Sequence, residues 1–177
     1  MNAAVRAGLV SDTHGLFDPR LPTLLQGCDL ILHAGDIVDP AILDDLSRIA
    51  PVRAVRGNND SSRAFPALPE VSVVEVGQLK ALLVHVAVAR GRILPTVRDA
   101  LSRDRAQLLV HGHSHRPLAS LQDGVLLVNP GSAGPRRFLL PRSAGLLEVR
   151  GRSAEVRLFD LASPRLTPLG APVAASW

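Results

Sequence analysis

The feature that most constrains this chain is a succession of short apolar runs, each followed by a polar stretch containing glycine or proline. Runs of this length and composition predict β-strands. The candidate strands are "VRAGLV" (5–10), "DLILHA" (29–34), "VRAVRG" (52–57), "VSVVEV" (71–76), "KALLVH" (80–85), "QLLVH" (107–111) and "GVLLVN" (124–129). Residues 144–161 read as two further alternating strands about a glycine-centred turn, which predicts an antiparallel hairpin.

Three stretches between these runs have the spacing of amphipathic helices, at 19–27, 40–50 and 93–103. Pro40 stands where a first helical turn tolerates proline, and Gly27 would end the first of the three. Strands alternate with helices early and dominate later, which predicts a layered α/β fold. A length of 177 residues suits one domain, which we assign to residues 1–162, with a Pro- and Ala-rich extended tail over residues 163–177.

Composition narrows the partners. The net charge of +4 comes almost entirely from arginine and suits an anionic substrate. Aromatic residues make up only 3% of the chain, too few to build an extended nucleic-acid surface, although a nucleotide-sized substrate stays open. No signal peptide or membrane-spanning run is evident, and the lone Cys28 cannot form an internal disulfide. We therefore predict a cytoplasmic protein with no membrane partner.

Side chains that can bind metals follow five of the predicted strands. Because ligands in α/β folds bind beyond the carboxyl ends of the strands, we expect these groups to converge on one edge. All six histidines of the chain lie in these segments, and none is used elsewhere. The candidate ligands are Asp12 and His14 in "LVSDTHG", Asp36 in "LHAGD", Asn58 in "VRGNND", His85 in "LLVH", and His113 and His115 in "LLVHGHSH".

Aspartate, asparagine and histidine without cysteine select borderline to hard divalent ions. Seven donors are too many for one tetrahedral zinc ion, but they suit two metals that share a bridging carboxylate. Two metals about 3.5–4 Å apart can clamp a phosphoryl group and activate a water. We therefore predict two divalent ions as cofactors, with Mn the first choice and Fe, Zn or Ni as alternatives.

The ordered set D-x-H, G-D, G-N-x-D, H and G-H-x-H resembles the calcineurin-like metallophosphoesterase superfamily. The short length, the "GNND" and the "NPGS" at 129–132 are similar to its small bacterial and archaeal phosphodiesterase branch. The resemblance runs from about Val5 to Arg136. It implies a β-sandwich of two sheets flanked by helices, in αββα layers, with the metals at the strand ends.

The same resemblance implies a role for each ligand. Asp12, His14 and His115 would hold the first metal, Asn58, His85 and His113 the second, and Asp36 would bridge both. A metal-bound hydroxide would attack phosphorus in line, with Asp36, Asn58 and His113 as the catalytic set. The substrate implied is a small phosphodiester or a nucleotide.

Two residues depart from the family pattern. Asn59 stands where larger members have a histidine near the leaving group, and an asparagine cannot supply a proton as a general acid. We therefore expect a preference for acidic leaving groups, and we take Asn59 and Arg116 as candidate substrate-binding residues. Val86 follows His85 where relatives have glycine, so either the loop runs differently or His85 is displaced and only packs.

Other polar residues of the motifs have plainer interpretations. His33 and His111 are expected to pack behind the ligands, and Asp60 to brace its loop. "NPGSAG" reads first as a tight turn, with Asn129 and Ser132 as weaker candidates for shaping the site. Further arginines near the motifs are surface charges or phosphate ligands: Arg90, Arg92 and Arg136.

Three functions stay open at this stage. A two-metal phosphodiesterase is the leading hypothesis, and a phosphomonoesterase is a variant of it. The rival is a non-catalytic scaffold of the same fold that recruits a protein partner, for which the retromer subunit of this fold is the precedent. A homo-oligomer is compatible with the sequence. The chain has no G-x-S-x-G elbow, no Walker A sequence and no H-E-x-x-H motif, which argues against three other chemistries.

Overall fold

The computed structural model describes residues 4–137 and 139–177, which form two facing β-sheets with helices on their outer faces. The larger sheet has seven strands. In spatial order they are β13 (Thr167–Pro168), β12 (Ser153–Asp160), β11 (Ser143–Arg150), β1 (Val5–Val10), β2 (Leu30–His33) and β3 (Val52–Ala54), with β14 (Val173–Ser176) also paired to β12.

The second sheet has five strands, and a two-stranded ribbon lies beside it. The order of the five is β4 (Val71–Val76), β5 (Leu79–Val84), β8 (Leu108–Val110), β10 (Val125–Asn129) and β9 (Leu118–Gln122). The ribbon is β6 (Val88–Ala89) paired with β7 (Arg92–Ile93).

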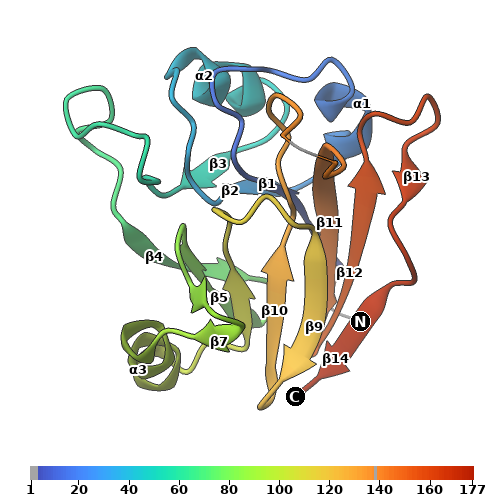
Figure 1. Ribbon diagram of the computed structural model, residues 1–177. Helices are drawn as coiled ribbons and strands as arrows, with labels where there is room; N and C mark the ends of the chain where they lie inside the picture. The colour runs from blue at the N-terminus through green and yellow to red at the C-terminus, as the bar shows by residue number, and fades with distance from the viewer. Residues whose placement is uncertain (1–3, 138) are drawn as a thin grey trace.

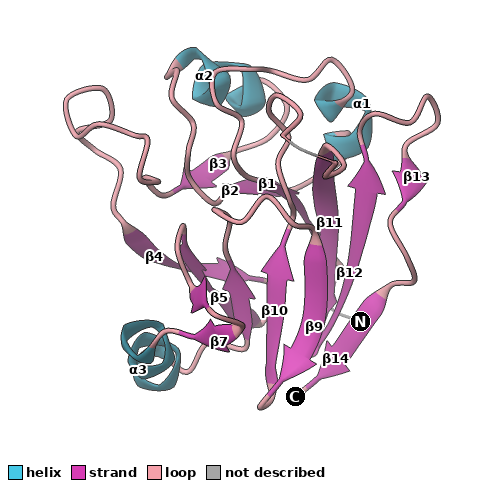
Figure 2. Ribbon diagram, in the orientation of Figure 1, coloured by secondary structure: helices cyan, strands magenta, loops and turns pink. Residues whose placement is uncertain are grey.

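Helices of the described residues cover the outer faces of the two sheets (Figure 2). They are α1 (Leu21–Leu25), α2 (Ala41–Ser47) and α3 (Pro95–Asp104). Residues of α1 and α2 pack with Val10 and Ile31 of the larger sheet, and those of α3 pack with Leu82 and Leu109 of the smaller. The predicted two-sheet sandwich flanked by helices is therefore confirmed. None of the helices in the described residues is long and apolar enough to cross a membrane.

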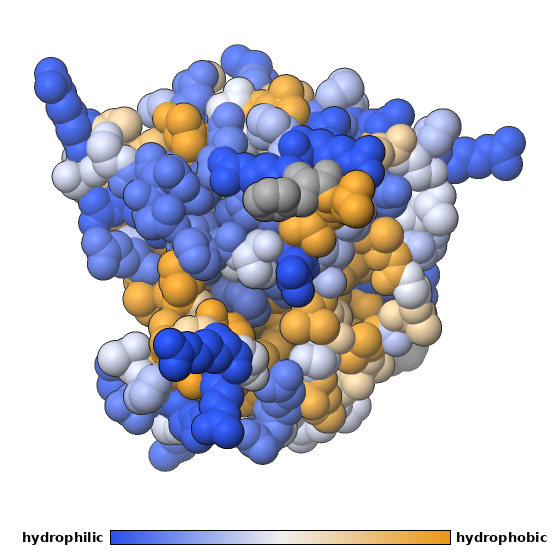
Figure 3. All heavy atoms as spheres, in the orientation of Figure 1, coloured by the Kyte–Doolittle hydropathy of each residue, from blue (hydrophilic) through white to orange (hydrophobic). Residues whose placement is uncertain are grey.

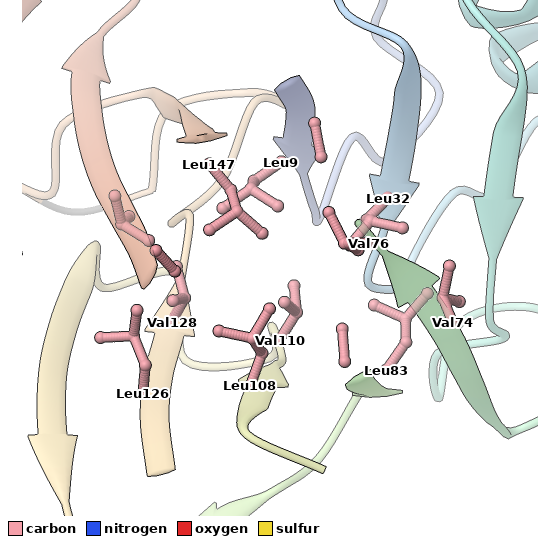
Figure 4. Packing of buried hydrophobic residues seen from close by; sticks show 14 of the residues in the cluster. Leu9, Leu32, Val74, Val76, Leu83, Leu108, Val110, Leu126, Val128 and Leu147 are labelled. Carbon is pink, nitrogen blue, oxygen red and sulfur yellow. The ribbon is translucent and has the colours of Figure 1, made fainter. Parts of the chain in front are cut away.

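The central core fills the space between the two sheets. Leu9, Leu32 and Leu147 of the larger sheet face Leu108 and Val110 of the smaller across this space (Figure 4). All five side chains are fully buried. In strands such as β5 nearly every residue is buried, because one face meets the other sheet and the opposite face meets a helix.

Strand directions place the polar ends of several strands at one edge. β1, β2 and β3 pair in parallel in the larger sheet, and β5, β8 and β10 do so in the smaller. The carboxyl ends of parallel strands lie together, so the loops that follow these strands meet where the two sheets face each other. All six loops carry residues that the sequence marked as functional candidates.

The stretch predicted as an extended tail contains β13 and β14, and both pair with β12. Its last residue, Trp177, donates its backbone N–H to Arg152 at 3.0 Å and its indole N–H to the carbonyl of Gly124. Trp177 also packs against the central core. The terminal segment thus covers the open side of the hairpin formed by β11 and β12.

Candidate metal centre

The first cluster of candidate ligands joins the loop after β1 to the loop after β8. One ligand atom from each of Asp12, His14 and His115 lies within 4.8 Å of the other two. The Nε2 atoms of His14 and His115 are 3.3 Å apart, and the Nε2 of His115 is 3.1 Å from Asp12 Oδ1. Asp12 Oδ1 is buried, and no hydrogen-bond partner for it is present among the described residues. Three donor atoms therefore converge on one point.

The second cluster centres on the side-chain oxygen of Asn58. That oxygen lies 3.1 Å from His85 Nε2 and 2.9 Å from His113 Nδ1. The two imidazole rings meet edge to face, with centroids 5.4 Å apart. His85 is buried and His113 is exposed, so this cluster opens to solvent on one side.

Asp36 lies between the two clusters. Its Oδ1 is 3.4 Å from His85 Nε2, and its Oδ2 is 3.7 Å from His14 Nε2. Each carboxylate oxygen therefore faces a different group of donors, which is the arrangement a bridging ligand requires. Asn59 forms two hydrogen bonds to the same carboxylate: its backbone N–H donates to Oδ1 at 2.8 Å and its side-chain amide donates to Oδ2 at 2.6 Å.

The protonation of this carboxylate follows from its contacts. Burial would raise the pKa of Asp36, but hydrogen bonds from His85 and Asn59 outweigh burial and hold that pKa well below its ordinary value. For His14, burial lowers the pKa, and the positive charge of the nearby Arg137 acts in the same direction. For His85, burial would lower the pKa, but the hydrogen bond to Asp36 prevails and raises it. The carboxylate is thus ionised and available as a ligand.

The tautomer of His85 is fixed by a backbone group behind it. Its Nδ1 lies 2.7 Å from the carbonyl oxygen of Ala34, which can only accept, so Nδ1 carries a proton and donates. Nε2, which faces Asp36 and Asn58, therefore donates to Asp36 while the ring is protonated and offers a lone pair to a metal once that second proton is lost. Metal-binding histidines are commonly oriented in this way. His85 is therefore not displaced by Val86, which has no positive φ.

Backbone strain is concentrated on the candidate ligands. The φ angles are +53° at Asp12, +47° at His14, +56° at Asp36, +69° at His113 and +58° at His115. Residues other than glycine rarely adopt this left-handed region, and such strain persists where the surrounding structure enforces it. Five of the seven candidates share this conformation, and the other five non-glycine residues with positive φ in the described chain lie outside the candidate set, so the strain supports a functional role for the cluster.

Two motif glycines stand where no side chain fits. A Cβ on Gly57 would overlap the Oδ1 of Asp36, and one on Gly112 would overlap the Oγ of Ser11. Gly57 of "GNND" thus lets the loop after β3 approach the carboxylate of Asp36, and Gly112 of "GHSH" lets the loop after β8 approach the loop after β1.

A layer of polar residues holds these loops in position. Ser132 donates its hydroxyl to the carbonyl of Asp12 at 2.8 Å, and Asn129 donates to the carbonyl of Gly112 at 2.8 Å. No hydrogen-bonded turn is assigned to residues 129–132, and Asn129 and Ser132 instead brace the site. Asp60 accepts from the backbone of Val38 at 2.7 Å and of Gly57 at 2.8 Å, which confirms the predicted bracing role.

The two remaining histidines are buried behind the ligands, as predicted. Burial lowers the pKa of His33 to about 4 and that of His111 to about 4. The Nδ1 of His33 accepts from the backbone of Gly35 at 3.2 Å, so its Nε2 donates to the Thr13 hydroxyl at 3.1 Å. That hydroxyl in turn donates to the carbonyl of Ile37 at 3.4 Å. His33 therefore supports the residue between Asp12 and His14.

The candidate substrate residues have different surroundings. Asn59 is exposed and its side-chain amide donates to Asp36, while Arg116 is exposed directly after His115 in the loop that follows β8. The other arginines that the sequence marked are likewise exposed: Arg90, Arg92 and Arg136.

Several polar residues that form hydrogen bonds or ion pairs in and near these loops were not identified from the sequence. Ser11 donates to Asp12 Oδ2 at 2.6 Å, and the buried Asp18 forms an ion pair with Arg142, whose guanidinium also donates to the carbonyl of Gly134 at 2.7 Å. Ser11 and Thr13 flank Asp12 in "LVSDTHG", so their place in the motif was the available signal. Asp18 and Arg142 are 124 positions apart, and no sequence pattern links them.

The chain was compared with known protein families, curated proteins and solved structures. The family model described as "Calcineurin-like phosphoesterase superfamily domain" matches residues 5–152. The chain belongs to the calcineurin-like phosphoesterase superfamily. It is 29% identical over 167 residues to a probable metallophosphoesterase of Methanothermobacter thermautotrophicus, a match that covers 89% of this chain and 93% of the relative. The small prokaryotic branch expected from the sequence is thereby supported.

Two further proteins bear on activity and fold. A phosphodiesterase of Methanocaldococcus jannaschii is 24% identical over 147 residues, covering 72% of this chain and 83% of the relative. Among solved structures, vacuolar protein sorting 29 of Cryptosporidium parvum matches with a TM-score of 0.82 and 21% identity, over 99% of this chain and 100% of that one. The structural match concerns the fold of the calcineurin-like phosphoesterase superfamily.

The side chains present fit divalent metal ions. Oxygen and imidazole nitrogen atoms lie close together, and the buried Asp12 Oδ1 has no hydrogen-bond donor among the described residues. Carboxylate, amide oxygen and imidazole are ligands of Mn, Fe and Zn. The family and the site together support a metal-dependent phosphoesterase.

Proposed function

We propose that this protein hydrolyses phosphodiesters with two divalent metal ions, of which Mn²⁺ is the first choice. The single observation that carries the proposal is the position of Asp36: its Oδ1 lies 3.4 Å from Nε2 of His85, in one group of candidate ligands, and its Oδ2 lies 3.7 Å from Nε2 of His14, in the other. One ion would need only one of these groups, and a carboxylate between both suits a shared pair.

Each ion would have its own protein ligands. Asp12, His14 and His115 would hold the first, Asn58, His85 and His113 would hold the second, and Asp36 would bind both. When bound, two such ions polarise phosphoryl oxygens and lower the pKa of water, which supplies the nucleophile for hydrolysis. Fe, Zn and Ni remain alternatives, because the same donors accept them.

The chain's own residues orient and hold this machinery. Ala34 fixes the tautomer of His85, Asn59 holds both oxygens of Asp36, and the strained backbone fixes the ligand positions. Such positioning reduces the reorganisation needed when charge develops on the phosphoryl group.

The leaving group receives little help at position 59. The amide of Asn59 is engaged with Asp36 and cannot act as an acid at neutral pH. We therefore propose a preference for diesters with acidic leaving groups, taken from small molecules or nucleotides. The net charge of +4 favours such anions. A cytoplasmic location stays a prediction, based on the single cysteine.

The decisive assay compares a diester with its monoester. Metal-stripped protein is given bis(p-nitrophenyl) phosphate or p-nitrophenyl phosphate, with and without Mn²⁺, and nitrophenolate release is followed. We expect Mn²⁺-dependent turnover that favours the diester. Faster turnover of the monoester would indicate a phosphomonoesterase. Metal binding without hydrolysis of either would favour the scaffold alternative.

A further inference from the structure

A cavity of about 300 Å³ lies beside the second cluster of candidate ligands. Asn58 and His85 line it, so it shares a wall with the proposed metal centre. The other principal lining residues are Arg56, Glu70, Val71 and Val86. A volume of this size accommodates one small group of a ligand and not a polymer. A chemical group bound in this cavity would therefore lie next to the proposed metal centre.

The walls of this cavity differ in chemistry. Val71 and Val86 supply an apolar side, and Val71 is 45% exposed although it is a large hydrophobic residue. Arg56 and Glu70 supply a charged side, with the Arg56 Nη2 3.2 Å from Glu70 Oε1. Arg56 and Glu70 belong to the segment that links β3 to β4, at the upper left of Figure 1. Mainly hydrophilic residues occupy the same part of the surface in Figure 3. The cavity therefore suits an anionic group attached to a partly apolar body.

Arg56 is held more firmly than its partner. The Arg56 side chain is 22% exposed, and its backbone N–H donates to the carbonyl of Pro69 at 2.8 Å. The Glu70 side chain is 79% exposed, and ion pairs with such solvated groups contribute little to stability. The Nε of Arg56 is buried, and no hydrogen-bond partner for it is present among the described residues. A half-buried guanidinium with one weak partner has capacity for a second anion.

We propose that this cavity binds a terminal phosphate carried by the substrate, and that Arg56 determines this specificity. The inference rests on the proposed function, since the scissile phosphate would lie at the neighbouring metals. Arginine binds phosphate oxygens through a planar fork of donors, which is stronger than binding to a neutral acceptor. The natural substrate is then a phosphodiester with an additional phosphate monoester group. Glu70 competes with that phosphate for Arg56.

The test uses two diesters with the same leaving group. They are thymidine 5′-(p-nitrophenyl phosphate) and its 3′-phosphorylated counterpart, assayed with Mn²⁺-loaded protein. We expect kcat/KM for the phosphorylated diester to be about tenfold higher, through a lower KM, since charge-assisted hydrogen bonds have effects of this order. Equal values for the two diesters would overturn the proposal.

Two variants separate ligand binding from a structural role. Arg56→Ala should abolish the preference for the phosphorylated diester, whereas Glu70→Gln should increase it by freeing the guanidinium. If the ion pair were merely structural, both variants would break the same contact and would change kcat/KM in the same direction. Arg53→Ala removes the same charge from an exposed position outside this cavity and should leave the preference unchanged.

Failure of catalysis can be told apart from failure of this inference. Bis(p-nitrophenyl) phosphate reports hydrolysis without using the phosphate subsite, so no turnover of it contradicts the proposed function alone. Titration calorimetry with the two thymidine diesters then still tests the cavity. Tighter binding of the phosphorylated diester by the wild type than by Arg56→Ala would support the inference, and equal binding would overturn it.

Discussion

At the scale of single residues, the candidate ligands are held by unfavourable backbone geometry and by hydrogen bonds from neighbouring polar groups. Asp36 combines a positive φ of 56° with two hydrogen bonds from Asn59. His85 relies on the carbonyl of Ala34, and Asp12 on the hydroxyl of Ser132. These supports fix where each donor atom points before any ligand arrives.

Replacement of Asp36 tests the bridging role. Asp36→Asn keeps the size of the side chain but removes the charge that two cations would share. We expect metal content, measured by mass spectrometry of the dialysed protein, to fall together with diester turnover, the latter by at least roughly 100-fold. Asp45→Asn, on the exposed face of α2, is the matched control and should change neither. Lost activity with full metal content would contradict a bridge.

His33 gives a prediction about pH. Its pKa is about 4 in the folded protein and about 6.5 in the unfolded chain, so between these values the unfolded state binds the proton that the folded state refuses. Stability of the metal-free protein should therefore fall as pH drops from about 6.5 to about 4. The contribution of His33 is about 2 kcal/mol between pH 7.5 and pH 5.

Urea unfolding at pH 7.5 and pH 5 measures this effect. His33→Gln should lose less stability on acidification than the wild type, by about the same amount. His111, whose pKa is also lowered to about 4, retains its own share of the pH dependence in that variant. An unchanged pH dependence in His33→Gln would show that this histidine is not held neutral.

At the scale of elements, the sequence predicted the strands closely where apolar runs were long. β1 and β4 have the predicted bounds, and the hairpin of β11 and β12 turns at Gly151 with a φ of +57°. α2 and α3 begin after Pro40 and at Pro95, inside the predicted helical stretches. β9 was missed because "LASLQ" is short, and its burial is only partial and without clear alternation.

The candidate ligands could be proposed from their order along the chain, but their geometry could not. A pattern of residue types carries no φ angles, so the strain at His113 and His115 was invisible. Likewise, the sequence suggested Asn59 as a candidate substrate-binding residue that lacks an acidic proton, but its hydrogen bond to Asp36 depends on how the loops after β2 and β3 meet. Contacts between distant loops arise from the sheet topology.

Gly57 tests how closely these loops must approach. Gly57→Ala would place a methyl group onto Asp36 Oδ1, so we expect a loss of about 3 kcal/mol in unfolding free energy and weaker metal binding. Gly124→Ala is the control: its φ of +77° is unfavourable for alanine, but nothing lies within 4 Å of the added group. That variant should lose about 1 kcal/mol and keep its metal affinity. Equal metal loss in both would contradict the argument.

At the scale of the whole molecule, the site is assembled from both sheets. Asp12, His14, Asp36 and Asn58 follow strands of the larger sheet, whereas the other three candidate ligands follow β5 and β8 of the smaller. The distance across each cluster therefore depends on how the two sheets pack, and the central core sets that packing.

Loosening the core should consequently weaken metal binding at a distance. Leu108→Ala removes a fully buried side chain between the sheets and should cost about 2–5 kcal/mol of stability. We also expect lower Mn²⁺ affinity, measured by calorimetry at a temperature where the variant is folded. Leu121→Ala, at a side chain that is 52% exposed on β9, should change neither quantity appreciably. Unchanged affinity in folded Leu108→Ala would show that the sheets hold the site without this contact.

The central claim is that two metal ions share Asp36, and anomalous diffraction from crystals grown with Mn²⁺ tests it most directly. We predict two peaks in the anomalous difference map from data collected near the manganese absorption edge. One should lie among Asp12, His14 and His115, and the other among Asn58, His85 and His113, with an oxygen of Asp36 next to each. A single peak, or two peaks that do not both contact Asp36, would contradict the account.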